Sequence, residues 1–446
     1  MTTPAELLKK YNIPTPRYTS YPTVPFWKNN ISEQDRFDIL SQYDLSQGVD
    51  LYIHIPFCQQ LCWYCGCNRV ISKDQEKMRI YVQSIMDEWK IYIQKYPLIK
   101  IKSLHFGGGT PNNLSNENFS LLLAFFKPYI ASDFIGAIEL DPRVLNKDFL
   151  YLLKEYGFKR LSMGIQDFDP KVQKVINRVQ PFELIKVICG WIKEIGFESF
   201  NFDLIYGLPK QNTKSITQTL EFVKMLSPDL MALYSYAHLP TQLKNQKLIN
   251  EDDLPSPQAK QELYKKAKMG LEYLGYQEIG LDHFAMPNSF LGKAKEKRTL
   301  TRSFMGYTDK KSDVLIGLGA SAISQTPESF VQNPKDLITY QYAIANSQIK
   351  INKSHYLSTD EKLEAQIIAE LMCYSRIEPK QYQRFKRNNQ IIQEIDQLRR
   401  DGLIELSNEG LSVTEIGKPF LRNIASVFDG HLRSTRALGK NFSSTA

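Results

Sequence analysis

The chain lacks the features that mark secreted and membrane proteins. Its first twenty residues hold no apolar signal core, and none of its apolar runs is long enough to span a bilayer. Only six cysteines occur in 446 residues, and four of them fall within residues 58–67. Such clustering suits a reducing compartment better than a disulfide framework. We therefore expect a cytoplasmic protein without membrane insertion.

Several catalytic patterns are missing as well. The six histidines form no H-E-x-x-H motif, and the sequence contains no P-loop and no spaced Ser/His/Asp set. Hydrolase and phosphoryl-transfer chemistry are therefore disfavoured. The formal net charge of +8 favours an anionic partner, which could be nucleic acid, a membrane surface or a polycarboxylate. The lack of a long Lys/Arg block or a basic recognition helix predicts that the partner is not nucleic acid.

The cysteine-rich segment is the strongest positive signal. Cys58, Cys62 and Cys65 follow the spacing CxxxCxxC, which lets three thiolates converge on one centre and leaves a fourth coordination position open. An iron–sulfur cluster normally takes four cysteines, so a cluster held by three has an iron free to bind a small molecule. A zinc site that also uses Cys67 and chance clustering in a core are the alternatives, but no second CxxC follows to complete a conventional zinc site.

Apolar segments alternate with amphipathic helical patterns between residues 51 and 236, which predicts a parallel sheet with right-handed crossovers. We expect an α/β fold of the open (β/α)6, partial TIM-type barrel kind, with its chemistry at the carboxyl ends of the strands. A doubly wound open sheet is the alternative. The predicted strands are Leu51–Ile55, Ser103–Phe106, Ala137–Leu140, Arg160–Gly164, Phe200–Ile205 and Met231–Tyr236.

Three parts are expected along the chain. Residues 1–45 form an N-terminal arm that begins with a short helix candidate and then becomes extended, because prolines at 14, 16, 22 and 25 exclude regular helix in that stretch. Residues 46–335 form the catalytic barrel, and residues 336–446 a mainly helical domain. In that last domain a capping box at 358–361, a helix at 390–400 and a hairpin at 402–414 resemble a winged helix. We interpret it as a packing or substrate-covering module, since fold does not imply function.

Small or polar residues occur at several predicted strand ends. Gly107-Gly-Gly-Thr110 would let a ligand contact bare backbone. Glu139, Gln166 and Asp203 lie at successive strands, and three such groups at one edge favour a polar ligand over separate structural roles. Arg178 follows Gln166 at helical distance, where its forked donors could clamp a carboxylate.

These motifs together resemble the oxygen-independent coproporphyrinogen III oxidase family of radical S-adenosylmethionine (SAM) enzymes, nearly end to end. The fourth cysteine and the arm motif favour the oxidases over their haem-chaperone relatives. The matching segments are Pro16-Arg-Tyr-Thr-Ser-Tyr-Pro22, Tyr52-Ile-His-Ile-Pro-Phe-Cys58, the CxxxCxxCxC loop, Gly-Gly-Gly-Thr-Pro, Gln166-Asp-Phe, Asp203-Leu-Ile-Tyr-Gly-Leu-Pro, Tyr236-Ala-His-Leu-Pro240, Asp282-His-Phe-Ala, Gly306-Tyr-Thr and Gly319-Ala-Ser-Ala-Ile-Ser324.

The resemblance implies a [4Fe–4S] cluster held by Cys58, Cys62 and Cys65, with Cys67 outside the ligand set. It also implies two SAM molecules. The residues that match contacts to the SAM on the cluster are Tyr52, Gly108, Glu139 and Ile323. Those that match contacts to the second SAM are Tyr64, Gly109, Thr110, Gln166, Arg178, Asp203 and Ala237.

The implied substrate is coproporphyrinogen III, a tetrapyrrole whose four carboxylates suit the positive net charge. A 5′-deoxyadenosyl radical would take a hydrogen from a propionate, and loss of CO2 and one electron would leave a vinyl group; two such conversions give protoporphyrinogen IX. The reaction needs an electron donor and an acceptor that the sequence does not identify. We expect a monomer. The alternative is a haem-binding relative without decarboxylase activity.

Three positions depart from the family pattern in the expected substrate half. Met286 and Lys247 stand where relatives often carry arginine, and Met305 stands where Phe-Gln-Gly-Tyr is commoner. Lysine is no equal of a forked arginine, so the carboxylate contacts are expected to differ from the family pattern. The candidates for these contacts are Arg17, Arg298 and Arg302.

Overall fold

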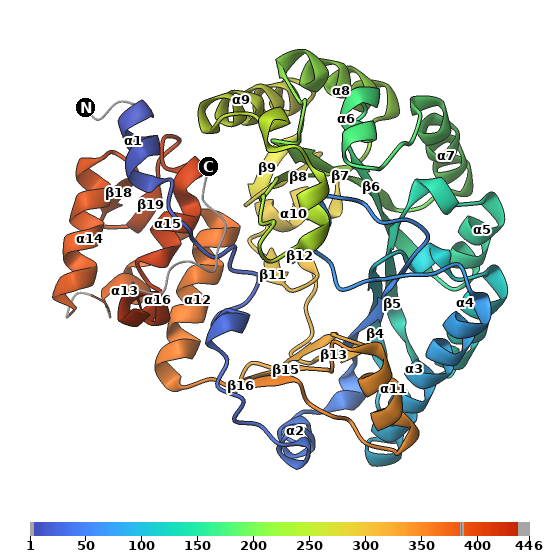
Figure 1. The fold of residues 1–446 in the computed structure, drawn as a ribbon. Helices are drawn as coiled ribbons and strands as arrows, with labels where there is room; N and C mark the ends of the chain where they lie inside the picture. Colours follow the sequence, from blue (N-terminus) through green and yellow to red (C-terminus); the bar gives the residue numbers. More distant parts are fainter. Residues whose placement is uncertain (1–3, 384, 386–387, 436–446) are drawn as a thin grey trace.

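A curved sheet organises most of the molecule (Figure 1). The computed structural model describes residues 4–383, 385 and 388–435, and within these ranges the sheet has twelve strands. Its parallel part runs in chain order through β1 (Val49–Ile55), β4 (Ile101–Gly108), β5 (Ile130–Leu140), β6 (Phe158–Gln166), β7 (Ser199–Tyr206) and β8 (Leu230–Ser235). All six predicted strands are therefore present, and most are longer than predicted.

The strand order excludes the doubly wound alternative, because neighbouring strands follow one another without a reversal of direction along the sheet. One further parallel strand, β13 (Leu315–Leu318), pairs with the other side of β1 and was not predicted. Antiparallel strands extend both edges: β14 (Ile323–Gln325), β15 (Ser329–Gln332) and β16 (Lys353–Tyr356) on one side, β10 (His283–Ala285) and β9 (Gln277–Gly280) on the other. β16 and β9 are not paired with each other, so the barrel is open.

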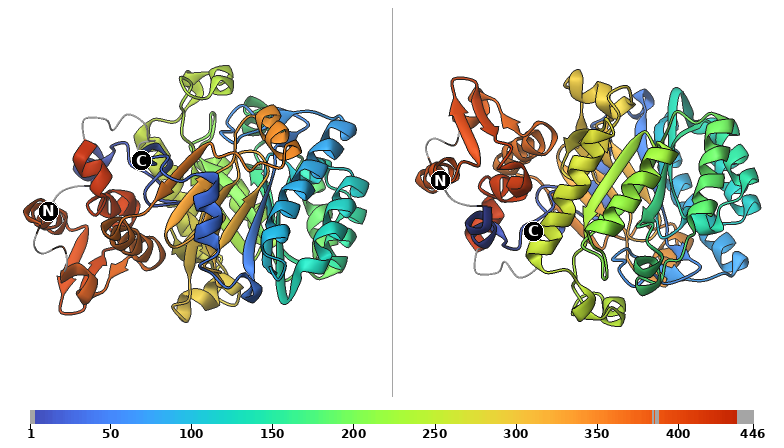
Figure 2. Two further views of the ribbon diagram at one scale, coloured as in Figure 1. Left: turned by 90° about the horizontal axis from the view of Figure 1, so that it is seen from below. Right: turned by 90° about the horizontal axis from the view of Figure 1, so that it is seen from above.

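Helices cover the convex face of the sheet (Figures 1 and 2). On α7 the buried residues Ile185, Ile188, Cys189 and Ile192 recur at helical spacing and pack on the sheet. The covering helices are α3 (Gln75–Lys95), α4 (Asn116–Phe126), α5 (Lys147–Glu155), α7 (Phe182–Ile195), α8 (Thr213–Leu226) and α9 (Pro257–Tyr273). Shorter elements connect them: β2 (Phe57–Cys58), β3 (Val70–Ile71), α6 (Pro170–Val175), α10 (Phe290–Glu296), β11 (Thr301–Ser303), β12 (Gly306–Thr308) and α11 (Leu337–Ala345).

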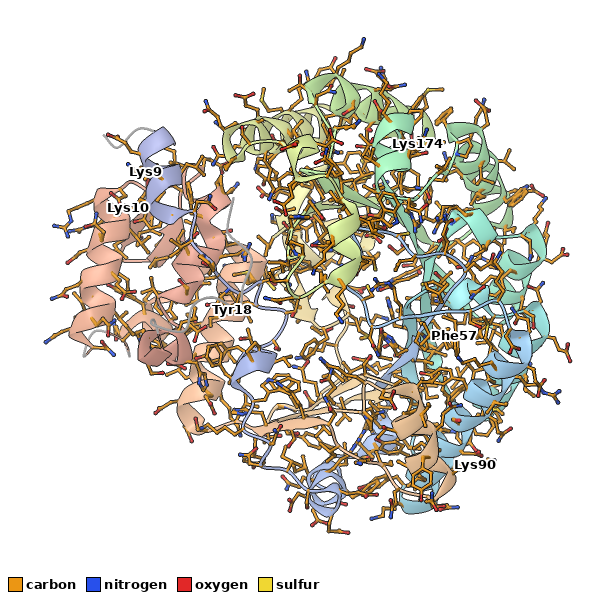
Figure 3. All side chains as sticks on the ribbon, viewed as in Figure 1. Lys9, Lys10, Tyr18, Phe57, Lys90 and Lys174 are labelled. Carbon is orange, nitrogen blue, oxygen red and sulfur yellow. The ribbon has the colours of Figure 1, made fainter. Side chains whose placement is uncertain are left out.

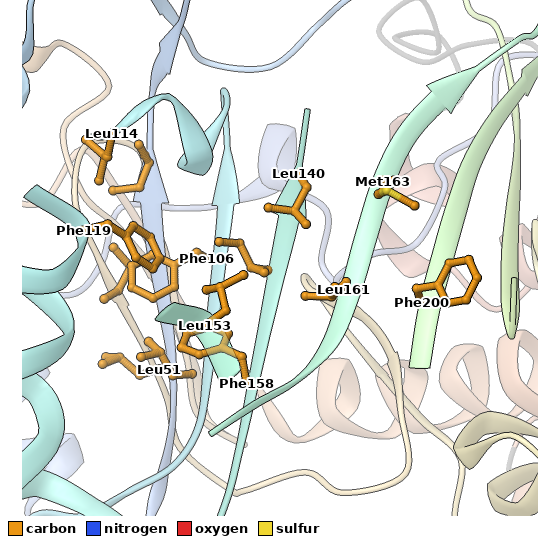
Figure 4. Close-up of a cluster of buried hydrophobic side chains, with 14 of the residues drawn as sticks. Leu51, Phe106, Leu114, Phe119, Leu140, Leu153, Phe158, Leu161, Met163 and Phe200 are labelled. Carbon is orange, nitrogen blue, oxygen red and sulfur yellow. The ribbon is translucent and has the colours of Figure 1, made fainter. Parts of the chain in front are cut away.

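The core between sheet and helices is rich in aromatic rings (Figure 4). The Phe106 ring lies 4.9 Å from that of Phe119 and 5.9 Å from that of Phe158, measured between centroids. Tilted and offset contacts of this kind add to the free energy gained from burial. This packing fixes the strands whose ends carry the candidate site.

The C-terminal elements follow the order of a winged helix. They are α12 (Thr359–Tyr374), β17 (Arg376–Ile377), α13 (Pro379–Gln383), α14 (Asn389–Arg400), β18 (Ile404–Ser407), β19 (Gly410–Val413), α15 (Leu421–Ser426) and α16 (Gly430–Thr435), with the strands ordered β17-β19-β18. The predicted capping box is present, since Ser358 and Glu361 exchange hydrogen bonds at the start of α12. The helix and the hairpin after it also form as predicted.

The N-terminal arm packs against this C-terminal module. After α1 (Pro4–Tyr11) the chain is irregular up to α2 (Glu33–Leu40), apart from one short 3-10 turn at 24–26. Tyr18 is buried where the arm meets the module, and its hydroxyl donates a 2.9 Å hydrogen bond to Asp429 (Figure 3). The domain boundaries at 45 and 335 stay a prediction; β15 and β16, on either side of 335, belong to one sheet. Residues 1–3, 384, 386–387 and 436–446 of the expected domains lie outside the described residues.

None of the helices within the described ranges combines the length and the apolarity that crossing a membrane requires.

Candidate active site

The cysteine loop leaves the carboxyl end of the first barrel strand. Cys58 ends β2, which follows β1 after a single residue, and β2 pairs with β3 to close the loop. Cys58 and Cys62 are buried, Cys65 is half-buried, and Cys67 is exposed. The three predicted cluster ligands are thus less exposed than the cysteine predicted to lie outside the ligand set.

Side-chain amides hold the loop in shape. Asn245 Nδ2 donates to the carbonyls of Trp63 at 2.8 Å and Cys65 at 3.0 Å, and Gln246 Nε2 donates to that of Tyr64 at 3.0 Å. Asn177 Nδ2 donates to the carbonyl of Leu61 at 2.8 Å. Sequence reasoning missed these amides, because Asn177 lies more than 100 residues beyond the cysteines and the Asn245-Gln246 pair more than 170.

Hydrogen-bond donors also point at the sulfurs. Thr110 Oγ1 lies 3.4 Å from Cys58 Sγ, and Arg143 and Arg178 each place a guanidinium nitrogen 3.6 Å from Cys62 Sγ. A hydrogen bond from Cys67, with the charges of Arg69 and Arg178, lowers the pKa of Cys65 to about 6, although burial opposes the shift. Burial raises the pKa of Cys58 to about 11, although the hydrogen bond from Thr110 opposes the shift. The contacts therefore favour the thiolate, the form that binds iron, at Cys65.

The donor set of the loop fits an iron–sulfur cluster. A structural zinc site is closed by four ligands, whereas here Cys58 and Cys62 are buried, Cys65 is half-buried and Cys67 is exposed. One loop with three cysteines and donors to their sulfurs is the ligand environment of an iron–sulfur cluster.

The glycine stretch lies beside this loop, and its backbone passes so close to neighbouring atoms that side chains would not fit. A Cβ added to Gly109 would lie 2.6 Å from the Pro56 carbonyl carbon and 3.1 Å from Cys58 Sγ. One added to Gly108, whose φ is +114°, would lie 2.6 Å from the His54 ring. The glycines were expected to expose backbone to a ligand; the structure shows that they are also required by the packing of β4 against the cysteine loop.

Two predicted carboxylates, Glu139 and Asp203, line a cavity of about 480 Å³ inside the barrel. Burial alone would raise the pKa of Glu139, but His105 Nε2, 3.5 Å away, and the Gly108 N–H lower it overall. Burial and the charge of Glu139 raise the pKa of Asp203 to about 6, although Ser162 donates to it at 3.0 Å. One acid is therefore fully ionised at neutral pH, and the other titrates closer to neutrality.

Arg178 is buried and already makes close contacts within the protein. Its guanidinium donates to the Gly164 carbonyl at 2.6 Å and to Asp141 Oδ2 at 3.2 Å. Arg143 shares Asp141 at 2.6 Å, and although burial raises the pKa of Asp141, the two cations lower it to about 2. Asp141 is a site residue that sequence reasoning missed, although it lies only two residues after Glu139 in the Ile-Glu-Leu-Asp-Pro segment.

The other predicted SAM contacts lie in or just after strands of the sheet. Tyr52 is in the middle of β1 and stacks on His105 with centroids 5.9 Å apart, whereas Gln166 ends β6 with φ +67°. Ala237 follows β8, and its carbonyl accepts from Gln246, the residue that also holds Tyr64. Ile323 starts β14, whose backbone packs directly on β13. The roles assigned to these residues stay predictions.

The three departures from the family pattern occupy different places. Met305 lines the barrel cavity. Met286 packs against the main hydrophobic core, and Lys247 is exposed on a short 3-10 turn.

The three arginines predicted to contact substrate carboxylates do not all lie together. Arg17 pairs with Asp282, and Arg302 donates to the Arg17 carbonyl at 3.1 Å, so these two are neighbours. Arg298 is apart from them; its side chain is 55% exposed and lies 3.5 Å from Glu378.

Comparison with known proteins agrees with this geometry. Residues 52–223, which contain the cysteine loop and most of the barrel, match the radical SAM superfamily. The oxygen-independent coproporphyrinogen III oxidases of Pseudomonas aeruginosa and Escherichia coli are each 37% identical to this chain, over 96% of it and over 96% and 95% of their own lengths. The chain belongs to the oxygen-independent coproporphyrinogen III oxidase family.

The fold of this family is also known from a solved structure. The coproporphyrinogen III oxidase of Escherichia coli, a radical SAM enzyme, superposes with a TM-score of 0.89 at 35% sequence identity. The match covers 94% of this chain and all of the other, so it includes the arm and the C-terminal module as well as the barrel.

Proposed function

We propose that this protein decarboxylates two propionate side chains of coproporphyrinogen III to vinyl groups and so produces protoporphyrinogen IX without oxygen. The observation that carries the proposal is the three-cysteine loop at the carboxyl end of β1, in a barrel whose cavity is lined by Glu139 and Asp203 and in a chain similar over nearly its whole length to oxidases of this name.

Two cofactors serve the reaction. Cys58, Cys62 and Cys65 hold a [4Fe–4S] cluster, and two SAM molecules bind at the strand ends. When bound, cluster and SAM supply the electron and the 5′-deoxyadenosyl radical that removes hydrogen from the substrate. The protein's own residues position these groups and exclude water and oxygen.

The proposal assigns individual side chains to the binding of SAM and of the cluster. Glu139 and Asp203 accept hydrogen bonds from bound SAM at the cavity wall. Arg178 binds the carboxylate of the second SAM, in competition with Asp141, which it now contacts at 3.2 Å. Thr110 and Arg143 hydrogen-bond to the sulfurs of Cys58 and Cys62 and so orient these two ligands toward the cluster.

The remaining partners are also part of the proposal. An external donor supplies the electron for SAM cleavage, and an external acceptor takes the electron left on the substrate after CO2 is lost. We place the enzyme in the cytoplasm, as a monomer that binds no nucleic acid.

Anaerobic turnover tests the function directly. Reconstituted protein with SAM, a reductant and coproporphyrinogen III is expected to form protoporphyrinogen and 5′-deoxyadenosine, and to stop when air or an iron chelator is admitted. The Cys62→Ser variant is the control. If the protein cleaves SAM, leaves coproporphyrinogen unchanged and binds haem tightly, the haem-carrier alternative replaces this proposal.

A further inference from the structure

A second cavity, of about 330 Å³, lies between the barrel edge and the C-terminal module. α9 and β9 form one wall, and β17, β19 and the start of α15 form the other. Cations outnumber carboxylates among the side chains that line it. The cations that line it are Arg17, Lys260, Lys265, Lys295, Arg376, Lys418 and Arg422, whereas the carboxylates are Glu278 and Asp282.

The two carboxylates are each engaged by a cation. Glu278 lies 2.6 Å from Lys268 and 3.5 Å from Lys418, and Asp282 pairs with Arg17. Two of the lining cations also have acidic partners outside the lining, since Lys418 lies 2.5 Å from Glu415 and Arg376 lies 3.5 Å from Glu409. The lining itself nevertheless holds more cations than carboxylates.

Burial and neighbouring cations both act on Lys260 and Arg422. Burial, together with repulsion from Arg422 and Arg17, lowers the pKa of Lys260 to about 8. Burial and repulsion from Arg17 likewise lower the pKa of Arg422 to about 10, against the attraction of Asp282. Cations that repel one another in a partly desolvated space favour an incoming anion.

The cavity adjoins the reaction chamber. Tyr234 and His283 line the barrel cavity, while Arg17 and Asp282 line the second one. The Arg17 guanidinium lies 5.5 Å from the centre of the Tyr234 ring, and Asp282 precedes His283 in the chain. The Arg17–Asp282 pair therefore lies at the boundary between the two cavities.

We infer that the second cavity binds carboxylate groups of the tetrapyrrole substrate, through Lys260, Lys265 and Arg422, while another propionate reaches the reaction chamber. The inference rests on the proposed function. A substrate with four carboxylates needs cations for those that are not reacting. In the chamber the cations Lys102, Arg160, Lys310 and Lys311 are offset by Asp50, Asp133, Glu139, Asp203 and Asp309, whereas cations outnumber carboxylates in the lining of the second cavity. Tyr264, Phe420 and Leu421 add apolar surface for the ring edge.

Fluorescence titration with coproporphyrin III, an air-stable tetracarboxylate, measures this binding. Lys260→Met removes the charge while keeping a long apolar side chain, and Lys265→Glu reverses a charge on an exposed residue that lines the cavity. We expect each to weaken binding about tenfold and to raise KM more than it lowers kcat. Lys260→Arg should restore most of the affinity.

The matched control is Lys266→Gln, on the same helix but exposed and outside the cavity lining, which should bind as the unaltered protein does. Coproporphyrin tetramethyl ester, which has no carboxylates, should bind weakly to every form. Equal affinity for ester and acid, or unchanged binding by both Lys260→Met and Lys265→Glu, overturns the inference while the proposed function stands. Unaltered protein that cleaves SAM without converting coproporphyrinogen overturns the proposed function instead.

Discussion

At the scale of the residue, neighbouring cysteines in the loop differ in burial and in contacts. These differences agree with the prediction that some bind the cluster and one does not. Cys62 is 6% exposed, and its sulfur accepts from two arginines, whereas Cys67 is exposed and donates to Cys65. The contacts of the Arg178 and Asp203 side chains likewise determine how these residues respond to substitution and to pH.

Exchanging single cysteines for serine should give unequal iron loss. Cys67→Ser is expected to retain iron, because Cys58, Cys62 and Cys65 already supply the protein ligands. Cys62→Ser should lose most of it. Iron content and the absorbance of anaerobically reconstituted protein measure the difference, and equal loss in the two variants would contradict the ligand assignment.

Arg178→Ala should weaken one SAM site, because losing a buried charge-assisted pair costs roughly 2–5 kcal/mol. Iron should stay bound, since the three cysteines are intact. The reduction potential of the cluster should become more negative, because a cation that donates to Cys62 is lost.

The matched control for Arg178 is Arg143→Ala. Arg143 also contacts Cys62 and Asp141 but is not expected to touch SAM, so this variant should shift the potential and keep both sites. Calorimetry and redox titration test both, and two undisturbed SAM sites in Arg178→Ala would rule the assignment out.

Asp203 should make SAM binding depend on pH. Its pKa is raised to about 6, so the carboxylate accepts hydrogen bonds above that pH and is protonated below it. Affinity at the second SAM site is therefore expected to fall as the pH falls through about 6. Asp203→Asn should bind more weakly at neutral pH and lose this dependence; a variant that keeps the same pH profile would assign the titration to another group.

At the scale of the element, the end of β4 has no room for side chains beside the cysteine loop. The Gly109 N–H donates to the Ile55 carbonyl at 2.8 Å, which fixes the end of β4 against the end of β1. The position of the loop relative to the cavity depends on this close approach.

Gly109→Ala should therefore displace the loop. Its Cβ would lie 2.6 Å from backbone atoms of Pro56, and strain of this kind costs about 1–3 kcal/mol. We expect lower iron content and a lower free energy of unfolding. Gly190→Ala on α7 is the control, since nothing lies within 4 Å of its Cβ, and there alanine should be neutral or stabilising. Similar behaviour of the two variants would contradict the packing argument.

At the scale of the whole molecule, the arm and the C-terminal module form one unit although they lie at opposite ends of the chain. Tyr21 OH donates to Glu364 at 2.5 Å and accepts from the Gly430 N–H at 3.0 Å. Arg422 donates to the Pro16 carbonyl at 3.1 Å, so the segment that carries Arg17 is anchored beside the second cavity.

Tyr21→Phe should loosen this unit. It leaves Glu364 without one donor in a largely buried setting, which costs about 1–3 kcal/mol. Faster cleavage of the arm in limited proteolysis is expected, with iron content unchanged. Tyr273→Phe, at a position 89% exposed, should be cleaved at the rate of the unaltered protein. An unchanged cleavage rate in Tyr21→Phe would show that the arm is held by other contacts.

Much of the fold could be predicted because its signals are local. The six barrel strands are short apolar segments bounded by helical patterns, and the capping box at Ser358 lies within four residues. β13 was missed because a four-residue apolar run cannot be distinguished from other buried segments by its pattern. Its place beside β1 depends on pairing between residues more than 250 apart.

The sequence by itself determined the chemistry: the spacing of three cysteines, the glycines and the strand-end carboxylates are short-range patterns that identify the family. Only the tertiary structure decided how these groups are supported. The loop is held by Asn245, Arg178 is shared between Asp141 and Cys62, and a cationic cavity forms where α9 meets the C-terminal module. Each arises from residues distant in the chain, and such contacts leave no periodic or local trace because packing selects them only once the chain has folded.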